Sequence, residues 1–528
     1  MLPLTLFLTS TCFATVYGYL WPSPMLDELE SLLYEITAQP PDMASFISPC
    51  DSFISGGIQT GRSNPADWIR TAYHDMASHN VADGTGGLDA SIRFAEEQAR
   101  PENAGNGFSN TLGVLAGFST RHVSIADTIA LGTVMAVEFC GGPRIPFRGG
   151  RIDATEPNVP GVPEPDQTLD SHIASFARQG FTQQEMITLV ACGHTFGGVQ
   201  HEPFPNIVHE MNDSNNTQSV AHFDTTNIHF DNNVATEYIS GTTQNPLVVG
   251  FNDTTNSDKR IFSSDGNVTM RSFANSPDLF ASSCSSLFAR MLDTVPRGVV
   301  LSDVITPLPV KPTNIQFSLD GDVLQFTGSV RFFNLPSKTN RVALLLWDDH
   351  LGATHNSTLL PSLAGTFTYV LGDVATSYRF GGDDFRGIAL DAAAGIVNMQ
   401  FMLDGKLQTQ QDQKTVDFAV QDAVVLSSTS CFYGNNATAR IDVAVRKTAA
   451  ASVKSVYIEV EDGSSVTKSD FFAVDSSAKV NEAYTMWSVN IPGSFFNRNV
   501  GAEIDGVEVV VAKVMKTLPA LPSCDSDS

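Results

Sequence analysis

The stretch WIRTAYHDMASHNVADGTGGLDAS, residues 68–91, decides which fold is expected for the first half of the chain. Helical spacing through its beginning places Arg70, Tyr73 and His74 at positions i, i+3 and i+4, so a guanidinium, an aromatic ring and an imidazole share one face. Asp75 is rotated by about 100° from that face. The spacing therefore predicts one helix that serves two sites, a pocket on one side and a loop on the other.

The loop after this helix is rich in glycine and in oxygen donors. Asp75 turns toward Gly87, Asp89 and Ser91, which offer a carbonyl, a carboxylate and a hydroxyl. Such donors suit a hard cation, and glycines let the backbone bend its carbonyls around an ion. The alternative is a surface helix with incidental charges. The loop, and a second motif about 120 residues later, weigh against that alternative.

Length and charge limit the class of protein. The chain has 528 residues, enough for two or three domains, and its formal net charge of −26 argues against nucleic acid or an anionic membrane as partner. Residues 1–18 resemble a signal peptide, an apolar run that ends in small residues but has almost no positive charge. No later apolar run is long enough to suggest a membrane-spanning helix. We therefore expect a secreted, extracellular protein.

Six cysteines remain after residue 18, an even number that suggests disulfides in an exported chain. The sequence alone leaves the pairing open. The pairs we expect are Cys50 with Cys140 and Cys431 with Cys524. Six glycosylation sequons fit an exported chain, and they lie at Asn212, Asn215, Asn252, Asn267, Asn356 and Asn436.

The residue pattern changes from helical to extended beyond residue 310. Before it, apolar residues recur at helical spacing, and one such helix begins with Thr182 and Glu185, a capping box. After it, short runs rich in Val, Ile, Phe and Thr are separated by Gly, Asn and Asp turns, which is typical of a β-sandwich. The expected parts are a signal peptide at 1–18, a mainly α domain at 19–300, a linker at 301–314 and an all-β, sandwich-like domain at 315–528.

A second motif, VACGHTFGG at residues 190–198, places His194 after an apolar helix and among small residues, as close approach of a flat cofactor requires. Together with RTAYHD at 70–75, it resembles the plant, fungal and bacterial haem peroxidase superfamily over residues 40–295, and within it the secreted fungal, class II-like members. The resemblance implies a mainly α domain that binds haem b. It also implies reduction of hydrogen peroxide with one-electron oxidation of small, phenolic-type donors.

The same resemblance assigns catalytic roles. It implies that His74 is the distal acid and base, that Arg70 is its cationic partner, and that Asn103 fixes the tautomer of the His74 ring. His194 would be the axial ligand of the haem iron. Asp265, in FSSDG, would hold the other ring nitrogen of that ligand.

Two calcium sites also follow from the resemblance. The distal site would use the loop donors Asp75, Gly87, Asp89 and Ser91. The proximal site would use Thr195, Asp224, Thr226, the carbonyl of His229, and Asp231. An Asp/Thr/Asp array at this spacing also occurs in ordinary turns, but its place beside a candidate axial histidine favours a cation.

Departures from the family pattern limit the classes of electron donor that we expect. Tyr73 would border the haem at a position where the family usually has Phe or Trp, and Leu189 stands where lignin peroxidases carry a surface tryptophan. No tryptophan lies between 194 and 300. The manganese-binding triad maps onto Ser63, Asp67 and Gln200. A single acid would hold Mn²⁺ poorly. We therefore expect a general peroxidase that oxidises small donor molecules.

Two other function classes remain open. One is a haem-free, calcium-stabilised adhesion or cell-wall binding protein in which the β domain does the work. The other is a His/Asp metallohydrolase, but Arg70 beside His74 would repel a dication. The partner suggested for the β domain is carbohydrate or matrix, an analogy from fold alone. Trp347 and Trp487 are expected in its core rather than on a sugar-binding surface.

Overall fold

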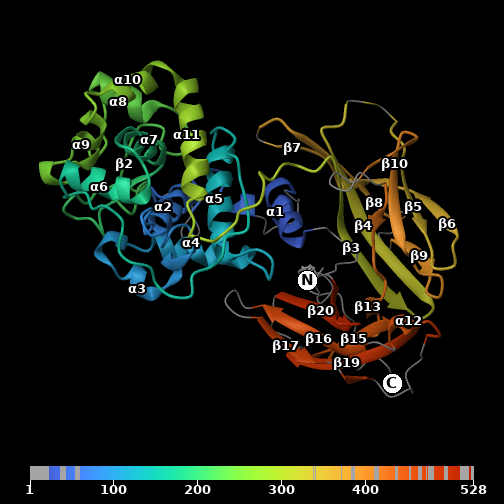
Figure 1. Ribbon diagram of the computed structural model, residues 1–528. Coiled ribbons are helices and arrows are strands. Elements are labelled where there is room, and N and C mark those ends of the chain that lie inside the picture. Colours follow the sequence, from blue (N-terminus) through green and yellow to red (C-terminus); the bar gives the residue numbers. More distant parts are fainter. Residues whose placement is uncertain are drawn as a thin grey trace, which may run out of the picture. The chain divides into compact units, whose positions relative to one another are not determined.

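The structure is a computed structural model, and the chain divides into two compact units, Glu28–Thr306 and, for the most part, the residues from Pro307 onward (Figure 1). The expected signal peptide at 1–18 and the sequon at Asn436 lie outside the described residues. The described residues are 23–35, 43–53, 60–336, 338, 340–369, 371–381, 387–409, 416–433, 438–450, 453–461, 466–470, 472–473, 481–492, 497–511 and 523–524.

The part of the chain before residue 300 is mainly α-helical, as the sequence predicts. A short antiparallel pair of strands, β1 (Gly198–Gln200) and β2 (Val220–His222), lies between two of its helices along the chain. The helices are α1 Pro24–Tyr34, α2 Asn64–Met76, α3 Ala95–Gln98, α4 Gly107–Leu115, α5 Ile125–Phe139, α6 Leu169–Gln179, α7 Gln183–Gly193, α8 Asn233–Ser240, α9 Ser257–Ser263, α10 Val268–Asn275 and α11 Pro277–Leu292.

Helix α5 is the buried centre of this unit. Its residues from Ile125 to Glu138 are all buried, as expected for a helix that is apolar nearly all round. It packs against α2. A Cβ at Gly132 would lie 2.8 Å from a methyl group of Leu115 and 3.2 Å from the Trp68 ring, so a glycine is needed for this approach. The close packing fixes α2, the helix that carries the first motif.

Three disulfides join distant parts of the chain. Cys50–Cys140 and Cys431–Cys524 confirm the two expected pairs. The third disulfide, Cys192–Cys284, joins α7 to α11. Cys192 lies two residues before His194, so this disulfide covalently fixes the second motif close to that histidine.

The part after Pro307 is rich in strands, again as predicted, and its described residues include a short helix, α12 Lys447–Ala450. The strands are β3 Val310–Asp320, β4 Val323–Phe333, β5 Ala343–Asp348, β6 Thr354–Thr358, β7 Leu360–Thr368, β8 Val374–Arg379, β9 Ile388–Asp391, β10 Asn398–Leu403, β11 Lys406–Leu407, β12 Phe418–Ala419, β13 Val424–Ser427, β14 Cys431–Phe432, β15 Thr438–Arg446, β16 Val453–Glu461, β17 Val466–Asp470, β18 Phe472–Ala473, β19 Tyr484–Pro492, β20 Asn497–Ile504 and β21 Val507–Val511. In the described residues they form sheets of five, ten and four strands.

This strand-rich unit has two hydrophobic cores, and the ten-stranded sheet contributes to both. On β15, Ala444 belongs to one core while its neighbours Val443 and Val445 belong to the other. Successive side chains of a strand point to opposite faces, so β15 is covered on both sides, and its sequence is correspondingly apolar. Trp347 is a buried member of the first core, as expected, whereas Trp487 is half-buried and packs against the second core.

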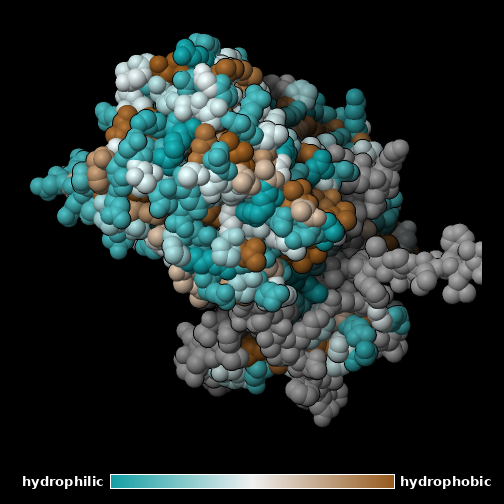
Figure 2. Space-filling view, turned by 60° about the vertical axis from the view of Figure 1, so that its left-hand side comes forward, coloured by the Kyte–Doolittle hydropathy of each residue, from teal (hydrophilic) through white to brown (hydrophobic). Residues whose placement is uncertain are grey.

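In the described part of the chain no helix has the length and apolar character needed to span a bilayer. The face shown in Figure 2 is largely hydrophilic, with hydrophobic side chains in small separate groups. Scattered apolar side chains of this kind are normal on protein surfaces.

Candidate functional site

Helix α2 positions the first group of predicted residues. Its start is fixed by Ser63, whose side chain accepts a hydrogen bond from the backbone N–H of Ala66. The turn after α7 also passes close to this helix, because a Cβ at Gly197 would lie only 2.6 Å from Cβ of Ala66. The two motifs of the sequence, 120 residues apart, are therefore neighbours in the fold.

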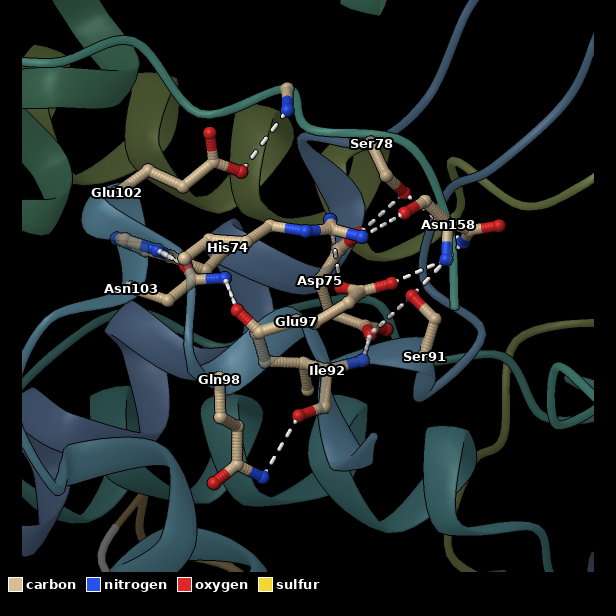
Figure 3. A network of polar contacts seen from close by, with 12 residues as sticks. His74, Asp75, Ser78, Ser91, Ile92, Glu97, Gln98, Glu102, Asn103 and Asn158 are labelled. Atoms are coloured by element: carbon tan, nitrogen blue, oxygen red, sulfur yellow. Dashed lines mark hydrogen bonds and ion pairs between the residues drawn. The ribbon is translucent and has the colours of Figure 1, made fainter. Parts of the chain in front are cut away.

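His74 is held by Asn103, as the sequence predicts. His74 Nδ1 lies 2.7 Å from Asn103 Oδ1, and Asn103 Nδ2 donates to the carbonyl of Glu97 at 2.8 Å (Figure 3). The second contact fixes the orientation of the amide, so Nδ1 is the ring nitrogen that donates. Nε2 of His74 is left with a free lone pair, which is what a general base requires.

The surroundings of His74 keep its ring neutral. Burial is the main cause, and the positive charge of Arg70 adds to it; together they hold the pKa of His74 well below its usual range, although the bond to Asn103 opposes them. The Phe108 ring lies 4.9 Å from the His74 ring. The arrangement therefore keeps the His74 imidazole neutral and weakly basic at neutral pH.

Arg70 is fixed on the same side of the helix. Its Nη2 donates to the carbonyl of Ala104 at 3.1 Å, and its guanidinium lies 4.4 Å from the centre of the Phe108 ring. Burial lowers the pKa of Arg70 to about 10, so the side chain is still a cation at neutral pH. Tyr73 lies beside this pair and stacks on Phe176 of α6. The three predicted residues Arg70, Tyr73 and His74 thus lie within one turn of α2.

Helix α7 presents His194 at its C-terminal end. The predicted capping box is confirmed, because the Thr182 side chain and the Glu185 side chain each bond the other's backbone N–H. His194 Nδ1 lies 2.7 Å from Oδ2 of Asp258, whose carboxylate is buried. The Phe223 ring stacks on the His194 ring at 4.0 Å, with an angle of 9° between the planes.

The partner of His194 is Asp258, and the prediction of Asp265 was wrong. Asp265 instead accepts hydrogen bonds from the backbone N–H groups of Val268 and Thr269, at 3.0 and 2.9 Å, and so caps the start of α10. The two aspartates each follow a serine and stand seven residues apart. Asp258, at the start of α9, faces the interior and is 1% exposed.

The distal loop assembles around Asp75. Its Oδ2 accepts from the backbone N–H groups of Asp89 and Ala90, and its Oδ1 accepts from that of Ile92. Nδ2 of Asn158, which the sequence did not identify, lies 2.9–3.3 Å from four side-chain oxygens (Figure 3); these are both Asp89 carboxylate oxygens and the hydroxyls of Ser78 and Ser91. An NH₂ group has only two hydrogens for these four acceptors.

The distal loop also concentrates negative charge. Burial, followed by the charge of Asp89, raises the pKa of Asp75 well above its usual range. Glu97 is buried nearby, and burial raises its pKa as well. An excess of oxygen donors and buried carboxylates fits a hard cation. Hydrogen bonds connect Asp75, Asp89 and Ser91, so these three predicted residues lie together.

The proximal loop brings four of its predicted residues together, Thr195, Asp224, Thr226 and Asp231. Thr195 donates to the carbonyl of Asp231, and the Thr226 hydroxyl lies 3.0 Å from Oδ1 of the same aspartate. Asp224 is buried, and its Oδ2 has no hydrogen-bond partner among the described residues. Burial, with smaller contributions from Asp231 and Glu237, raises the pKa of Asp224 to about 7. A buried carboxylate oxygen without a partner fits a cation at this position.

The acidic side chains alone do not make a metal site. Within the described ranges, no group of three or more His, Cys, Asp or Glu side chains is placed to hold an ion. Each loop provides two predicted aspartates, and the remaining donors are hydroxyls and backbone carbonyls. Calcium accepts such mixed oxygen donors, whereas softer transition metals prefer nitrogen or sulfur.

The position of a manganese-binding triad is occupied by an internal network. Asp67 accepts from Arg62 at 2.5 Å, and Arg62 also donates to Asn106 at 2.6 Å. Gln200 donates to Gln218 at 2.8 Å. The single acid of this group is therefore neutralised by a guanidinium, which disfavours a divalent cation there.

Comparison with known proteins agrees with this geometry. The peroxidase family profile matches residues 50–276. The match covers most of the helical unit, Glu28–Thr306, and less than half of the whole chain. The chain is 40% identical over 316 residues to a WSC domain-containing protein of Arthroderma benhamiae, covering 59% of this chain and 43% of that protein.

Two further relatives carry peroxidase names. L-ascorbate peroxidase 5 of Arabidopsis thaliana is 35% identical over 136 residues, which is 25% of this chain and 48% of that protein. A putative heme-binding peroxidase of Aspergillus fumigatus is 32% identical over 148 residues, 27% of this chain and 45% of that protein. The chain thus spans less than half the length of each of these three relatives.

Proposed function

We propose that the helical unit binds haem b through His194 and reduces hydrogen peroxide while oxidising small, phenolic-type donors in one-electron steps. The observation that carries this proposal is a pair of histidines with matched anchors. Nδ1 of His74 and Nδ1 of His194 each lie 2.7 Å from a buried acceptor, Asn103 and Asp258 respectively. Each ring then keeps Nε2 for chemistry, one as a base and the other as an iron ligand.

On the distal side the chain moves protons. Nε2 of His74 takes a proton from the bound peroxide and returns it to the departing oxygen, which leaves as water. Arg70, already fixed by Ala104 and Phe108, stabilises the negative charge that develops as the O–O bond breaks, and it needs no reorganisation to do so. When bound, haem supplies the electrons for that cleavage and recovers them from two donor molecules. One peroxide, two electrons and two protons give two waters.

The small size of the proposed donors rests on what surrounds these residues. Asp67 is paired with Arg62, which argues against oxidation of Mn²⁺ at this position. The ring stacked on His194 is Phe223, which is harder to oxidise than a tryptophan. Leu189 is buried and offers no redox-active group. Small molecules that reach the haem themselves remain the best-supported donors.

We further propose calcium in both loops. Asp75, Asp89, Ser91 and the carbonyl of Gly87 would hold the distal ion. The proximal ion would be held by Thr195, Asp224, Thr226, His229 through its carbonyl, and Asp231. The unpartnered Oδ2 of Asp224 and the four oxygens around Asn158 Nδ2 support these sites.

Export is part of the same proposal. Three disulfides are characteristic of proteins that fold outside the reducing cytosol. For the strand-rich unit we propose a carbohydrate or matrix partner, which sedimentation with insoluble polysaccharide tests. Only the fold supports this partner, since Trp347 is a core residue and Trp487 packs against a core.

Absorption spectroscopy tests the proposed activity. The purified full-length protein should show a Soret band that changes when one equivalent of hydrogen peroxide is added and returns when a phenol is added. Absence of the band after incubation with haemin would favour the haem-free binding protein instead. A band that does not respond to peroxide would overturn the role of the distal residues.

A further inference from the structure

The carboxylate that holds His194 also receives a second hydrogen bond. Oδ2 of Asp258 accepts from His194 Nδ1 at 2.7 Å and from Asn245 Nδ2 at 2.8 Å. Both donors use the same oxygen. Among the described residues, the other oxygen, Oδ1, is contacted only by the Ser257 hydroxyl, at a long distance of 3.5 Å. Asn245 and Asp258 are each 1% exposed, so solvent does not compete for this oxygen.

The orientation of the Asn245 amide is fixed by its other end. Its Oδ1 accepts from the backbone N–H of Leu247 at 2.8 Å. If the amide were flipped, its oxygen would face the Asp258 carboxylate and its NH₂ group would face the Leu247 N–H. Both contacts would be repulsive, so the amide has one consistent orientation. The Asn245 backbone is held too, since its N–H donates to the Thr243 hydroxyl and its carbonyl accepts from Val248. The donor is thus a rigid part of the site.

A second donor changes what the carboxylate can do for the histidine. A carboxylate that accepts the ring N–H of an axial histidine makes that ring more anionic and a stronger donor to the metal. A hydrogen bond from a neutral amide stabilises the negative charge on the same oxygen and reduces its basicity. The bond to His194 is then weaker than it would be to a carboxylate without this donor.

We propose that Asn245 is a positioning residue that limits the electron donation of His194 to iron by sharing Oδ2 of Asp258. The amide does not titrate, so its effect is constant with pH. The inference rests on the proposed binding of haem through His194. It predicts a ferric/ferrous midpoint potential that is less negative than Asp258 alone would set.

The test uses full-length protein loaded with haem b. Asn245→Leu removes the donor at nearly constant volume, and we expect the midpoint potential to shift to more negative values. The iron–histidine stretching frequency of the ferrous form should rise in resonance Raman spectra. Asp258→Asn removes the charge and should move both quantities in the opposite direction. Two variants of one hydrogen-bonded pair with opposite signs are not expected from general loosening of the site.

A matched control separates tuning from stability. Asn232 is also a buried asparagine, and its Nδ2 donates to the carbonyl of Phe273 at 2.8 Å, so Asn232→Leu should lower stability without moving the potential or the stretch. If Asn245→Leu does not fold, Asn245→Ala should give the same signs with a smaller shift. Potentials and stretches that stay unchanged, or that move in the direction of Asp258→Asn, would overturn the inference.

The failure of this inference differs from failure of the proposed function. A wild-type protein without a Soret band, or without an iron–histidine stretch, would refute binding of haem through His194. A wild-type protein with both, and an Asn245→Leu variant identical to it, would refute only the role of Asn245.

Discussion

The two histidines of the helical unit are anchored by the same geometry but by different acceptors. Nδ1 of His74 faces the neutral amide of Asn103, and Nδ1 of His194 faces the carboxylate of Asp258, both at 2.7 Å. A neutral acceptor selects a tautomer and leaves the ring weakly basic. A charged acceptor adds electron density to the ring as well. The charge of one acceptor atom therefore suits one imidazole to proton transfer and the other to metal binding.

The surroundings strengthen this difference. His74 lies near a cation, Arg70, which together with burial keeps its pKa well below the usual value. His194 instead stacks on the uncharged ring of Phe223. Each acceptor is itself held by a further group, Asn103 by the Glu97 carbonyl and Asp258 by Asn245.

Replacing His74, the proposed distal base, should give the largest effect of the changes considered. His74→Leu should slow the reaction with hydrogen peroxide by about 10³-fold, because general acid–base catalysis contributes about 10²–10⁴. Haem should stay bound through His194, so stopped-flow spectra of the Soret band measure the rate directly. His209→Gln, an exposed histidine stacked on Phe251, is the control and should react at the wild-type rate. An equal rate in the His74 variant would remove its assigned role.

The proposed calcium sites in the distal and proximal loops, beside His74 and His194 respectively, should affect the stability of the fold. Chelation with EGTA should lower the melting temperature, because a ligand present at 100 times its dissociation constant contributes about 3 kcal/mol per site. Asp89→Asn and Asp224→Asn should each remove part of that effect, whereas Asp213→Asn in an exposed loop should not. Differential scanning calorimetry measures the melting temperatures, and elemental analysis measures the bound calcium. Protein that contains no calcium and ignores EGTA would contradict both sites.

The size of the EGTA effect should depend on pH. In the calcium-free fold, burial with Asp231 and Glu237 raises the pKa of Asp224 from 3.8 to about 7. A raised carboxyl pKa favours the fold below the unfolded value, and this contribution is lost as pH rises through about 7. The calcium-free protein should therefore weaken between pH 4 and 7, and the difference made by calcium should grow over the same range.

Exchanging the acceptor is a milder change that tests the comparison directly. Asn103→Asp places a carboxylate against His74, which should raise the pKa of the ring and protonate it at mildly acidic pH. At pH 6 the peroxide rate should fall by about tenfold, which corresponds to about 1.4 kcal/mol, and it should recover as pH rises. Asn103→Leu should slow the reaction at every pH instead. A pH–rate profile of Asn103→Asp that matches the wild type would show that acceptor charge is not decisive.

Much of the fold and part of the site are encoded locally. The spacing of Arg70 and His74 and the capping box of α7 depend on residues within one or two helical turns, so the sequence predicts them correctly. The change from helix to strand beyond residue 310 is visible in the same way. Each of these features needs only neighbouring residues to be recognised.

Residues that act across the fold could not be found in this way. Asn158 and Asn245 lie outside helices and strands, where no periodicity marks them. Asn158 contacts Ser91, which is 67 residues away in the sequence, and Asn245 contacts Asp258, which is 13 residues away. Both contacts depend on how the loops fold back toward the site. Arg62 and Asp67 are only five residues apart, but Arg62 lies before the start of α2, so helical spacing does not show their pairing.

The error over Asp265 has a specific cause, and the smallest predicted effect tests it. NSD at 256–258 and SSD at 263–265 offer two aspartates in one short segment, and the sequence does not say which one is buried. Asp265 caps α10, so Asp265→Ala should cost about 1 kcal/mol of unfolding free energy and leave the haem spectrum unchanged. Asp258→Ala should alter the spectrum, because it removes the anchor of His194. Denaturant titration and absorption spectra of both variants separate the roles, and a spectral change in Asp265→Ala would mean that the cap also controls the ligand.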